Sequence, residues 1–170
     1  MLQSKYNLDS ERYTFSKPWD YTPPTRYTAE NLQITSGGRG IIMSGADNVV
    51  RNNVIEVDGK VAVYLYGPRP VVEGNTFIVR MDPRDNATLP AVLKLRDAEG
   101  AIIRNNRFII QNSGQGEMTM PWANRPQSEA AINLLNSPNV LIENNTVEGT
   151  RELVRKDAAS TTVEQGNTLK

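Results

Sequence analysis

The sequence predicts an all-β solenoid of about six short stacked coils, because one asparagine context recurs along the chain. Each of these asparagines is followed two positions later by an apolar residue, and a pair of aliphatic residues precedes each of the first four. The five are Asn53, Asn75, Asn106, Asn145 and Asn167. Their spacings of 22, 31, 39 and 22 residues describe a 22-residue unit with insertions of 9 and 17 residues. Such a period is typical of stacked units that are each too small to bury a core alone.

Each unit is predicted to hold three short strands. In the unit that contains Asn75, residues 61–66 alternate with the period of two that marks a strand with one buried face. The Gly-Pro-Arg-Pro turn leads to a second strand at Val71 and Val72, and the bend at Asn75 leads to a third at 77–79. Strands repeated in this way, one level above another, form a parallel β-helix.

The two ends of the chain depart from the repeat. Leu32 and Ile34 are matched to Ile55 and Val57, which puts a glutamate at the asparagine position of the first coil. Residues 1–28 do not fit the repeat and are predicted to cap it, which leaves 29–170 as the β-helix domain. The last coil is expected to be frayed, and its exposed strand edges predict a homo-oligomer formed through the coil ends.

Three segments carry a resemblance to a known family. Val-Val-Arg-Asn-Asn-Val-Ile (49–55), Ile-Ile-Arg-Asn-Asn-Arg-Phe (102–108) and Leu-Ile-Glu-Asn-Asn-Thr-Val (141–147) resemble the repeats of the right-handed parallel β-helix, or pectate lyase-like, superfamily. The resemblance covers about residues 29–169. It implies a right-handed coil with asparagines stacked at the turn between the second and third strands. It also implies a carbohydrate-active protein, since the superfamily includes lyases, hydrolases and epimerases of polysaccharides, together with tailspikes and non-catalytic adhesins.

Composition excludes several functions. The 19 basic and 19 acidic residues cancel, so no nucleic-acid or membrane partner is expected. The chain has no histidine and no cysteine, which removes histidine acid-base catalysis, thiolate chemistry and zinc-thiolate sites. An extracellular or cell-surface location is compatible with the sequence, although no signal peptide is visible. The sequence does not identify the compartment.

The asparagines themselves are expected to be structural. Stacked amides can donate and accept along the rod, which satisfies the hydrogen bonds that a buried amide requires. A second column beside them alternates in charge from coil to coil, as expected for pairing between neighbouring strands. It consists of Arg51, Glu73, Arg104 and Glu143.

Function is expected near the two insertions. They lie around 80–89 and 111–128, after a third strand and before the next first strand, so both leave the rod at the same corner on successive levels. The adjacent first-strand face is predicted to expose two columns of side chains. These are Ile42, Tyr64, Lys94 and Asn133, and Ser44, Tyr66, Arg96 and Leu135.

The candidate substrate-binding residues combine aromatic rings, which suit sugar C–H surfaces, with polar and cationic groups, which suit hydroxyls and uronate carboxylates. They are Tyr64, Tyr66, Asn133, Trp122 and Arg125. The tyrosines have the alternative role of ordinary strand residues covered by loops, and Trp122 that of the small core of its own loop.

Two chemistries are compatible with these residues. In β-elimination, Lys94 or Arg96 would be the base that removes the proton α to a uronate carboxyl, and the other would stabilise the enolate. Calcium is the one cofactor that the acids suggest, through Asp82, Asp85 or Asp97. Hydrolysis would need a pair of carboxylates, and no clear pair lies on neighbouring levels.

The predicted function is therefore to engage an extended acidic, uronate-rich polysaccharide along the first-strand face, with polysaccharide lyase activity if the protein is catalytic. The alternative is a non-catalytic structural or adhesion module, or a truncated piece of a longer β-helix protein.

Overall fold

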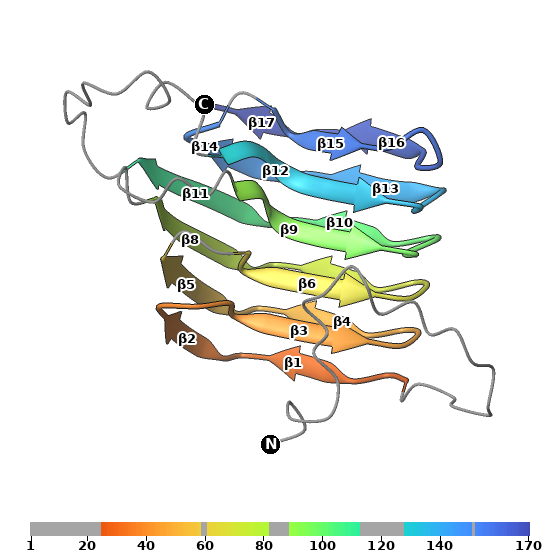
Figure 1. Ribbon diagram of the computed structural model, residues 1–170, viewed down its shortest axis with the longest axis horizontal. Coiled ribbons are helices and arrows are strands. Elements are labelled where there is room, and N and C mark those ends of the chain that lie inside the picture. Colours follow the sequence, from red (N-terminus) through yellow and green to blue (C-terminus); the bar gives the residue numbers. More distant parts are fainter. Residues whose placement is uncertain (1–24, 59–60, 82–88, 113–127, 151) are drawn as a thin grey trace.

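The computed structural model describes residues 25–58, 61–81, 89–112, 128–150 and 152–170. These residues form three parallel sheets that the chain visits in turn on every coil (Figure 1). Sheet C comprises β3 (Ile41–Ser44), β6 (Val63–Tyr66), β9 (Leu89–Arg96), β12 (Ser128–Leu135) and β15 (Val154–Lys156). Sheet A comprises β1 (Thr28–Glu30), β4 (Val49–Arg51), β7 (Val71–Glu73), β10 (Ile102–Arg104), β13 (Val140–Glu143) and β16 (Thr162–Gln165). Sheet B comprises β2 (Gln33–Ser36), β5 (Val54–Asp58), β8 (Thr76–Met81), β11 (Arg107–Asn112), β14 (Thr146–Glu148) and β17 (Thr168–Leu169).

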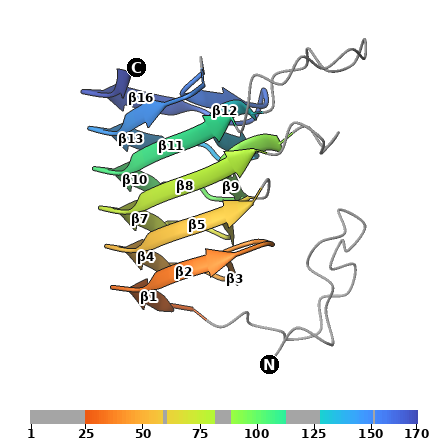
Figure 2. The same ribbon diagram turned by 90° about the vertical axis from the view of Figure 1, so that its left-hand side faces the viewer.

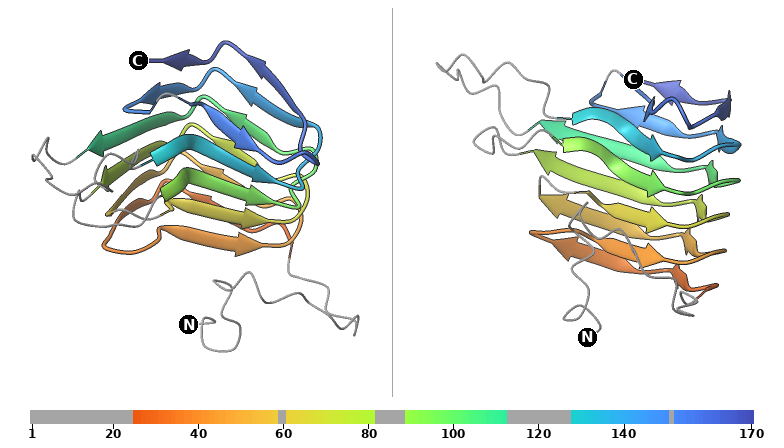
Figure 3. Two further views of the ribbon diagram at one scale, coloured as in Figure 1. Left: turned by 45° about the horizontal axis from the view of Figure 1, so that its top comes forward. Right: turned by 45° about the vertical axis from the view of Figure 1, so that its right-hand side comes forward.

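Every strand pairs in parallel with the equivalent strand of the next coil. Neighbouring strands of one sheet are therefore three strands apart in sequence, as in β4, β7 and β10 (Figure 2). The three sheets form the sides of a prism (Figure 3). The predicted solenoid and its three strands per coil are thus confirmed. None of the described segments is a helix with the length and apolarity that crossing a membrane requires.

The core consists of the inward side chain of each strand, stacked in columns along the rod. On sheet B the register places Ile55, Phe77, Phe108 and Val147 above one another, and all four are fully buried. The Phe77 and Phe108 ring centroids lie 5.0 Å apart. Because the coils repeat in register, each apolar side chain packs on its counterpart one level away, which is how short units share one core.

The asparagine ladder lies at the bend between sheets A and B. Asn53, Asn75, Asn106 and Asn145 are 1–2% exposed, and each side-chain amide donates to the side-chain oxygen of the next asparagine at 2.9–3.0 Å. Each amide donates a second bond to a backbone carbonyl of sheet A one coil back, and each oxygen from Asn75 onward also accepts the backbone N–H of the asparagine before it. The ladder is therefore fully satisfied within the protein, as its predicted structural role requires.

The register of the first coil differs from the prediction. Ile34 pairs with Ile55 and Ser36 with Val57, so Leu32, and not Glu30, occupies the ladder position. Glu30 instead pairs with Arg51. The prediction was wrong by two residues because alternation has a period of two and both alignments keep apolar residues in the same phase. The Leu32 backbone N–H donates to the Asn53 side-chain oxygen at 2.9 Å, so the ladder still reaches the first coil.

The two insertions are confirmed at one corner of the rod. Residues 82–88 connect β8 to β9, and residues 113–127 connect β11 to β12. The strand ends on either side pair with each other, Arg80 with Gln111 and Leu89 with Ser128. Both connections therefore leave sheet B and enter sheet C on adjacent coils. Residues 1–24, most of the predicted cap, lie outside the described residues.

The last coil carries polar residues at positions that are apolar in the coils before it. Lys156, Thr162 and Glu164 pair with the buried Leu134, Val140 and Ile142. The Lys156 ammonium donates to the Thr162 hydroxyl at 2.6 Å, and that hydroxyl donates to the Glu164 carboxylate at 2.8 Å. A chain of hydrogen-bonded polar groups thus covers part of the core at this coil.

Candidate binding face on sheet C

The outward face of sheet C carries the predicted columns of side chains. The register aligns Ile42, Tyr64, Lys94 and Asn133 on four successive coils, and aligns Ser44, Tyr66, Arg96 and Leu135 beside them. Both predicted columns are confirmed. The structure extends the first column by Arg155 on β15, a residue that sequence reasoning missed because the last coil keeps little of the repeat. Its guanidinium lies 3.2 Å from the Glu152 carboxylate.

The tyrosines are packed and not freely exposed. Tyr64 is only 7% exposed, because the Lys94 ammonium lies 4.9 Å from its ring centroid and the Tyr66 ring lies 4.3 Å away. The expectation of two exposed tyrosines was therefore wrong for Tyr64. Burial raises the pKa of the Tyr64 hydroxyl far above its ordinary value of 10.0, and the nearby Tyr66 adds to the rise. Tyr64 thus remains a neutral proton donor at physiological pH and is excluded as a base.

Two buried polar atoms on this face lack a hydrogen-bond partner. Within the described part of the chain, no group meets the geometry of a hydrogen bond to the Tyr64 hydroxyl or the Asn133 side-chain oxygen, although Tyr66 and Arg96 lie near enough to the hydroxyl to influence its pKa. Asn133 is 8% exposed and stands one coil beyond Lys94, just as Tyr64 stands one coil before it. A buried polar group without a partner costs about 1–3 kcal/mol, so two in one column require an explanation.

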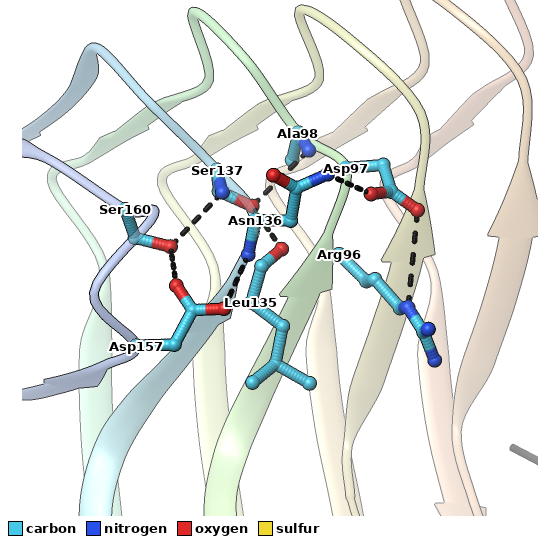
Figure 4. A network of polar contacts seen from close by, with 8 residues as sticks. All are labelled: Arg96, Asp97, Ala98, Leu135, Asn136, Ser137, Asp157 and Ser160. Atoms are coloured by element: carbon cyan, nitrogen blue, oxygen red, sulfur yellow. Dashed lines mark hydrogen bonds and ion pairs between the residues drawn. The ribbon is translucent and has the colours of Figure 1, made fainter.

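Arg96 and Asp97 lie where sheet C ends and the chain turns towards sheet A. The Arg96 guanidinium is 3.8 Å from the Asp97 carboxylate, and its side chain is 36% exposed. Asp97 has a φ of 53° and takes the same turn position as Gly67 and Asn136 on the neighbouring coils, which also have positive φ. The Asn136 side-chain amide donates to its carboxylate at 2.6 Å (Figure 4).

This turn carries a second network of side chain-to-backbone hydrogen bonds, which sequence reasoning missed (Figure 4). The Asp157 carboxylate accepts the Asn136 backbone N–H at 2.9 Å and the Ser160 hydroxyl at 2.6 Å. The Ser160 oxygen accepts the Ser137 N–H at 2.9 Å, and the Ser137 oxygen accepts the Ala98 N–H at 3.1 Å. The hydrogen bond from Ser160 lowers the pKa of Asp157 below its ordinary value. Asp97 lies in the same turn and accepts a hydrogen bond from the Asn136 side chain, so it has a structural role there.

The metal prediction gains no support from the described residues. They contain no group of three or more acidic side chains that could hold a metal ion. Calcium takes six to eight oxygen ligands, and Asp97 contributes one carboxylate beside a guanidinium. The other predicted ligands, Asp82 and Asp85, and the predicted sugar contacts Trp122 and Arg125 lie outside the described residues, so these assignments stay predictions.

Comparison with known proteins supports the fold. No curated protein and no solved structure gave a significant match to the chain. The family described as right handed beta helix region matches residues 22–169, which include every strand of the structure. With its three parallel sheets and stacked asparagines, the chain therefore belongs to the right-handed β-helix family.

Proposed function

We propose that the outward face of sheet C binds an extended acidic polysaccharide that runs along the rod axis. The observation that carries this proposal is the pair of unpartnered polar atoms, the Tyr64 hydroxyl and the Asn133 oxygen, on either side of Lys94 in one column. A ligand that supplies hydroxyl groups at both levels would satisfy them. Adjacent coils lie about 4.8 Å apart, so the two atoms lie on levels about 10 Å apart, which one small ion cannot bridge.

The charges of the face indicate an anionic ligand. Lys94 lies between the two unpartnered atoms, and Arg96 is the next outward side chain on β9. Arg155 ends the column that contains Lys94. Ammonium and guanidinium groups form short charge-assisted hydrogen bonds with carboxylates. Hydroxyls and carboxylates that alternate along an extended chain are the chemistry of a polyuronate.

The aromatic pair adds a surface for sugar rings. Tyr66 is partly exposed and packs against the buried Tyr64, so its ring is held in place before any ligand arrives. A pre-positioned ring gives apolar contact at low entropic cost. The coil that carries the tyrosines would thus contact the faces of sugars, and the coils with Lys94 and Asn133 their polar edges.

A second candidate function, β-elimination of the bound polysaccharide, is favoured by one observation. Tyr64 is held neutral beside two cations, Lys94 and Arg96. Once a base removes the proton α to the uronate carboxyl, its electron pair forms the new C=C bond, and the oxygen of the broken glycosidic bond takes up a proton. A protonated tyrosine can supply that proton, and a neighbouring cation can stabilise the intermediate charge.

Isothermal titration calorimetry with oligogalacturonates and alginate oligomers tests the binding function, with a neutral maltooligosaccharide of equal length as the ligand control. We expect Lys94→Ala to weaken acidic-oligosaccharide binding by about tenfold or more, since a hydrogen bond to a charged group contributes about 1.5–3 kcal/mol. The matched control is Arg107→Ala, which removes an exposed cation from sheet B, on another side of the rod. Equal affinity for both variants, or preference for the neutral sugar, would refute the proposal.

The same oligosaccharides separate binder from lyase. Elimination creates an unsaturated uronate, whose ultraviolet absorbance rises with time. Binding with such a rise, abolished by Tyr64→Phe, indicates the lyase. Binding without it indicates a non-catalytic carbohydrate-binding module, and the absence of both leaves the structural module.

A further inference from the structure

Sheet A carries a column of apolar side chains on each of its two faces. Its middle residues, such as Val50 and Ile103, point into the core and are fully buried. The residues that precede them point outward and form an apolar stripe along the rod. The stripe consists of Val49, Val71, Ile102, Leu141 and Val163. The first four are half-buried by their neighbours, and Val163 is 61% exposed.

The column at the equivalent first strand position of sheet B is mostly polar, so the repeat does not require an apolar residue there. That column consists of Gln33, Val54, Thr76, Arg107, Thr146 and Thr168. In parallel sheets, consecutive apolar residues are typical of strands that are covered on both faces. The aliphatic pairs that mark the repeat are therefore more apolar than a solvent-facing sheet requires.

A charge column runs beside the stripe, two residues further along each strand. In coil order it reads Glu30, Arg51, Glu73, Arg104, Glu143 and Gln165. Neighbours already form pairs within the chain: Arg51 with Glu30 at 2.6 Å, and Arg104 with Glu73 at 2.7 Å. The side chains of Arg51, Glu30 and Arg104 remain 41–44% exposed, so they can also contact a partner.

The order of these charges is complementary to itself when reversed. Consider two copies of sheet A that face each other across a two-fold axis parallel to their strands. The first coil of one copy then faces the last coil of the other, and each position along a strand faces the same position of the opposite strand. The stripe then faces the stripe. In the charge column, Arg51 faces Glu143 of the second copy, and Glu73 faces Arg104. The first and last coils bring together Glu30 and Gln165, so no like charges meet.

The turns that flank the stripe are compatible with the same arrangement. On the ladder side the turn residues are Asn or Gly on every coil, all with positive φ, and none is charged. On the other side, Asp47 and Arg69 form an ion pair at 2.7 Å, and the equivalent residues two coils further on are Gly100 and Asn139. In the two-fold arrangement, Asp47 of one copy therefore faces Asn139 of the other, and Arg69 faces Gly100, so no like charges meet at this turn either.

From this pattern we propose that sheet A is a self-association surface, on which a second copy of this chain docks face to face and antiparallel. The face spans six coils, about 24 Å, and about six positions along the chain, about 20 Å, or roughly 500 Å² per copy. Standard stable interfaces bury about 800 Å² per partner, so the dimer is reversible and depends on protein concentration.

Charge reversal tests the pairing directly. In Arg51→Glu, residue 51 would face Glu143 of the other copy at two symmetric places, and in Glu143→Arg, residue 143 would face Arg51. Each variant alone should dimerise about tenfold more weakly or worse, because facing like charges are strongly unfavourable. An equimolar mixture of the two variants should recover wild-type association, because residues 51 and 143 again meet with opposite charge in the heterodimer.

Sedimentation velocity over a micromolar-to-millimolar concentration series measures these constants, and circular dichroism confirms that each variant is folded. The matched control is Arg107→Glu, which breaks the exposed ion pair with Glu148 on sheet B and should leave dimerisation unchanged. Three results would each overturn the proposal: a wild-type protein that stays monomeric throughout, variants that associate like wild type, or a mixture that fails to recover association. Because the mixture shares every intrachain effect with its components, recovery reports on the interface alone.

Discussion

Replacing Asn106 with alanine removes the central rung of the asparagine ladder. Its side-chain oxygen accepts the Asn75 backbone N–H and the Asn75 amide, both at 3.0 Å. Its own amide donates to the Val72 carbonyl at 2.9 Å and to the Asn145 side-chain oxygen at 3.0 Å. The substitution therefore deletes four buried hydrogen bonds, and the Asn75 N–H is left in the core without its acceptor.

The expected loss follows from these contacts. Four hydrogen bonds at about 1 kcal/mol each predict a decrease of about 4 kcal/mol in the free energy of unfolding. The comparison variant is Asn167→Ala on the last coil, where the amide oxygen and nitrogen make three bonds that are only partly buried. Water can replace those bonds, so we expect a loss of about 1 kcal/mol.

Urea denaturation followed by circular dichroism measures both variants, since the midpoint shift multiplied by the slope m gives the change in unfolding free energy. The ladder would be shown to be dispensable if Asn106→Ala lost no more stability than Asn167→Ala. Such a result would mean that the apolar columns alone hold the coils in register.

Three further outcomes are expected. Gly74 has a φ of +65°, and a Cβ added there would lie 2.5 Å from the Asn52 side-chain oxygen, so Gly74→Ala should lower the thermal midpoint. Gly37→Ala is the control and should lower it far less, because a Cβ added at Gly37 meets nothing within 4 Å. Tyr64→Phe should leave the free energy of unfolding unchanged or raise it, because it removes a buried hydroxyl that lacks a partner among the described residues; a clear loss in urea denaturation would contradict this. The pKa of Asp157 is lowered in the folded state, so its carboxylate stabilises the fold at pH values above its ordinary pKa of 3.8. This contribution is lost as the pH falls through the folded-state pKa. The difference in unfolding free energy between wild type and Asp157→Ala, measured across an acid series, should therefore shrink at low pH.

The ladder and the sheet C columns could be predicted because both depend on short-range patterns. An asparagine that recurs with paired aliphatics before it identifies a turn, and alternation in the first strand assigns each side chain to one face. Tyr64, Lys94 and Asn133 aligned as predicted because stacked coils repeat at the same register. The first coil failed this test, since its strand has no asparagine at the ladder position to anchor the alignment.

Burial and pairing within the site could not be read in advance. Tyr64 became buried because the Lys94 ammonium, one coil further along the same column, and the Tyr66 ring, in the neighbouring column, close over it, and Lys94 is 30 residues away in sequence. Asp97 was expected as a calcium ligand, and its hydrogen bond to Asn136 arises across 39 residues of chain. The same holds for Asp157 and Ser160, whose partners lie one coil away and whose spacing differs from that of the ladder.

By itself, the sequence determined the architecture: the period, the three strands per coil, the structural asparagines and the corner at which the insertions leave the rod. These follow from chemistry repeated within 22 residues, where each unit carries its own turn and its own apolar face. Only the tertiary structure decided which polar atoms are buried without partners, which acids belong to turns, and that Glu30 joins the charge column of sheet A. Those properties depend on which residues of different coils become neighbours, and insertions of unequal length make that depend on the fold as a whole.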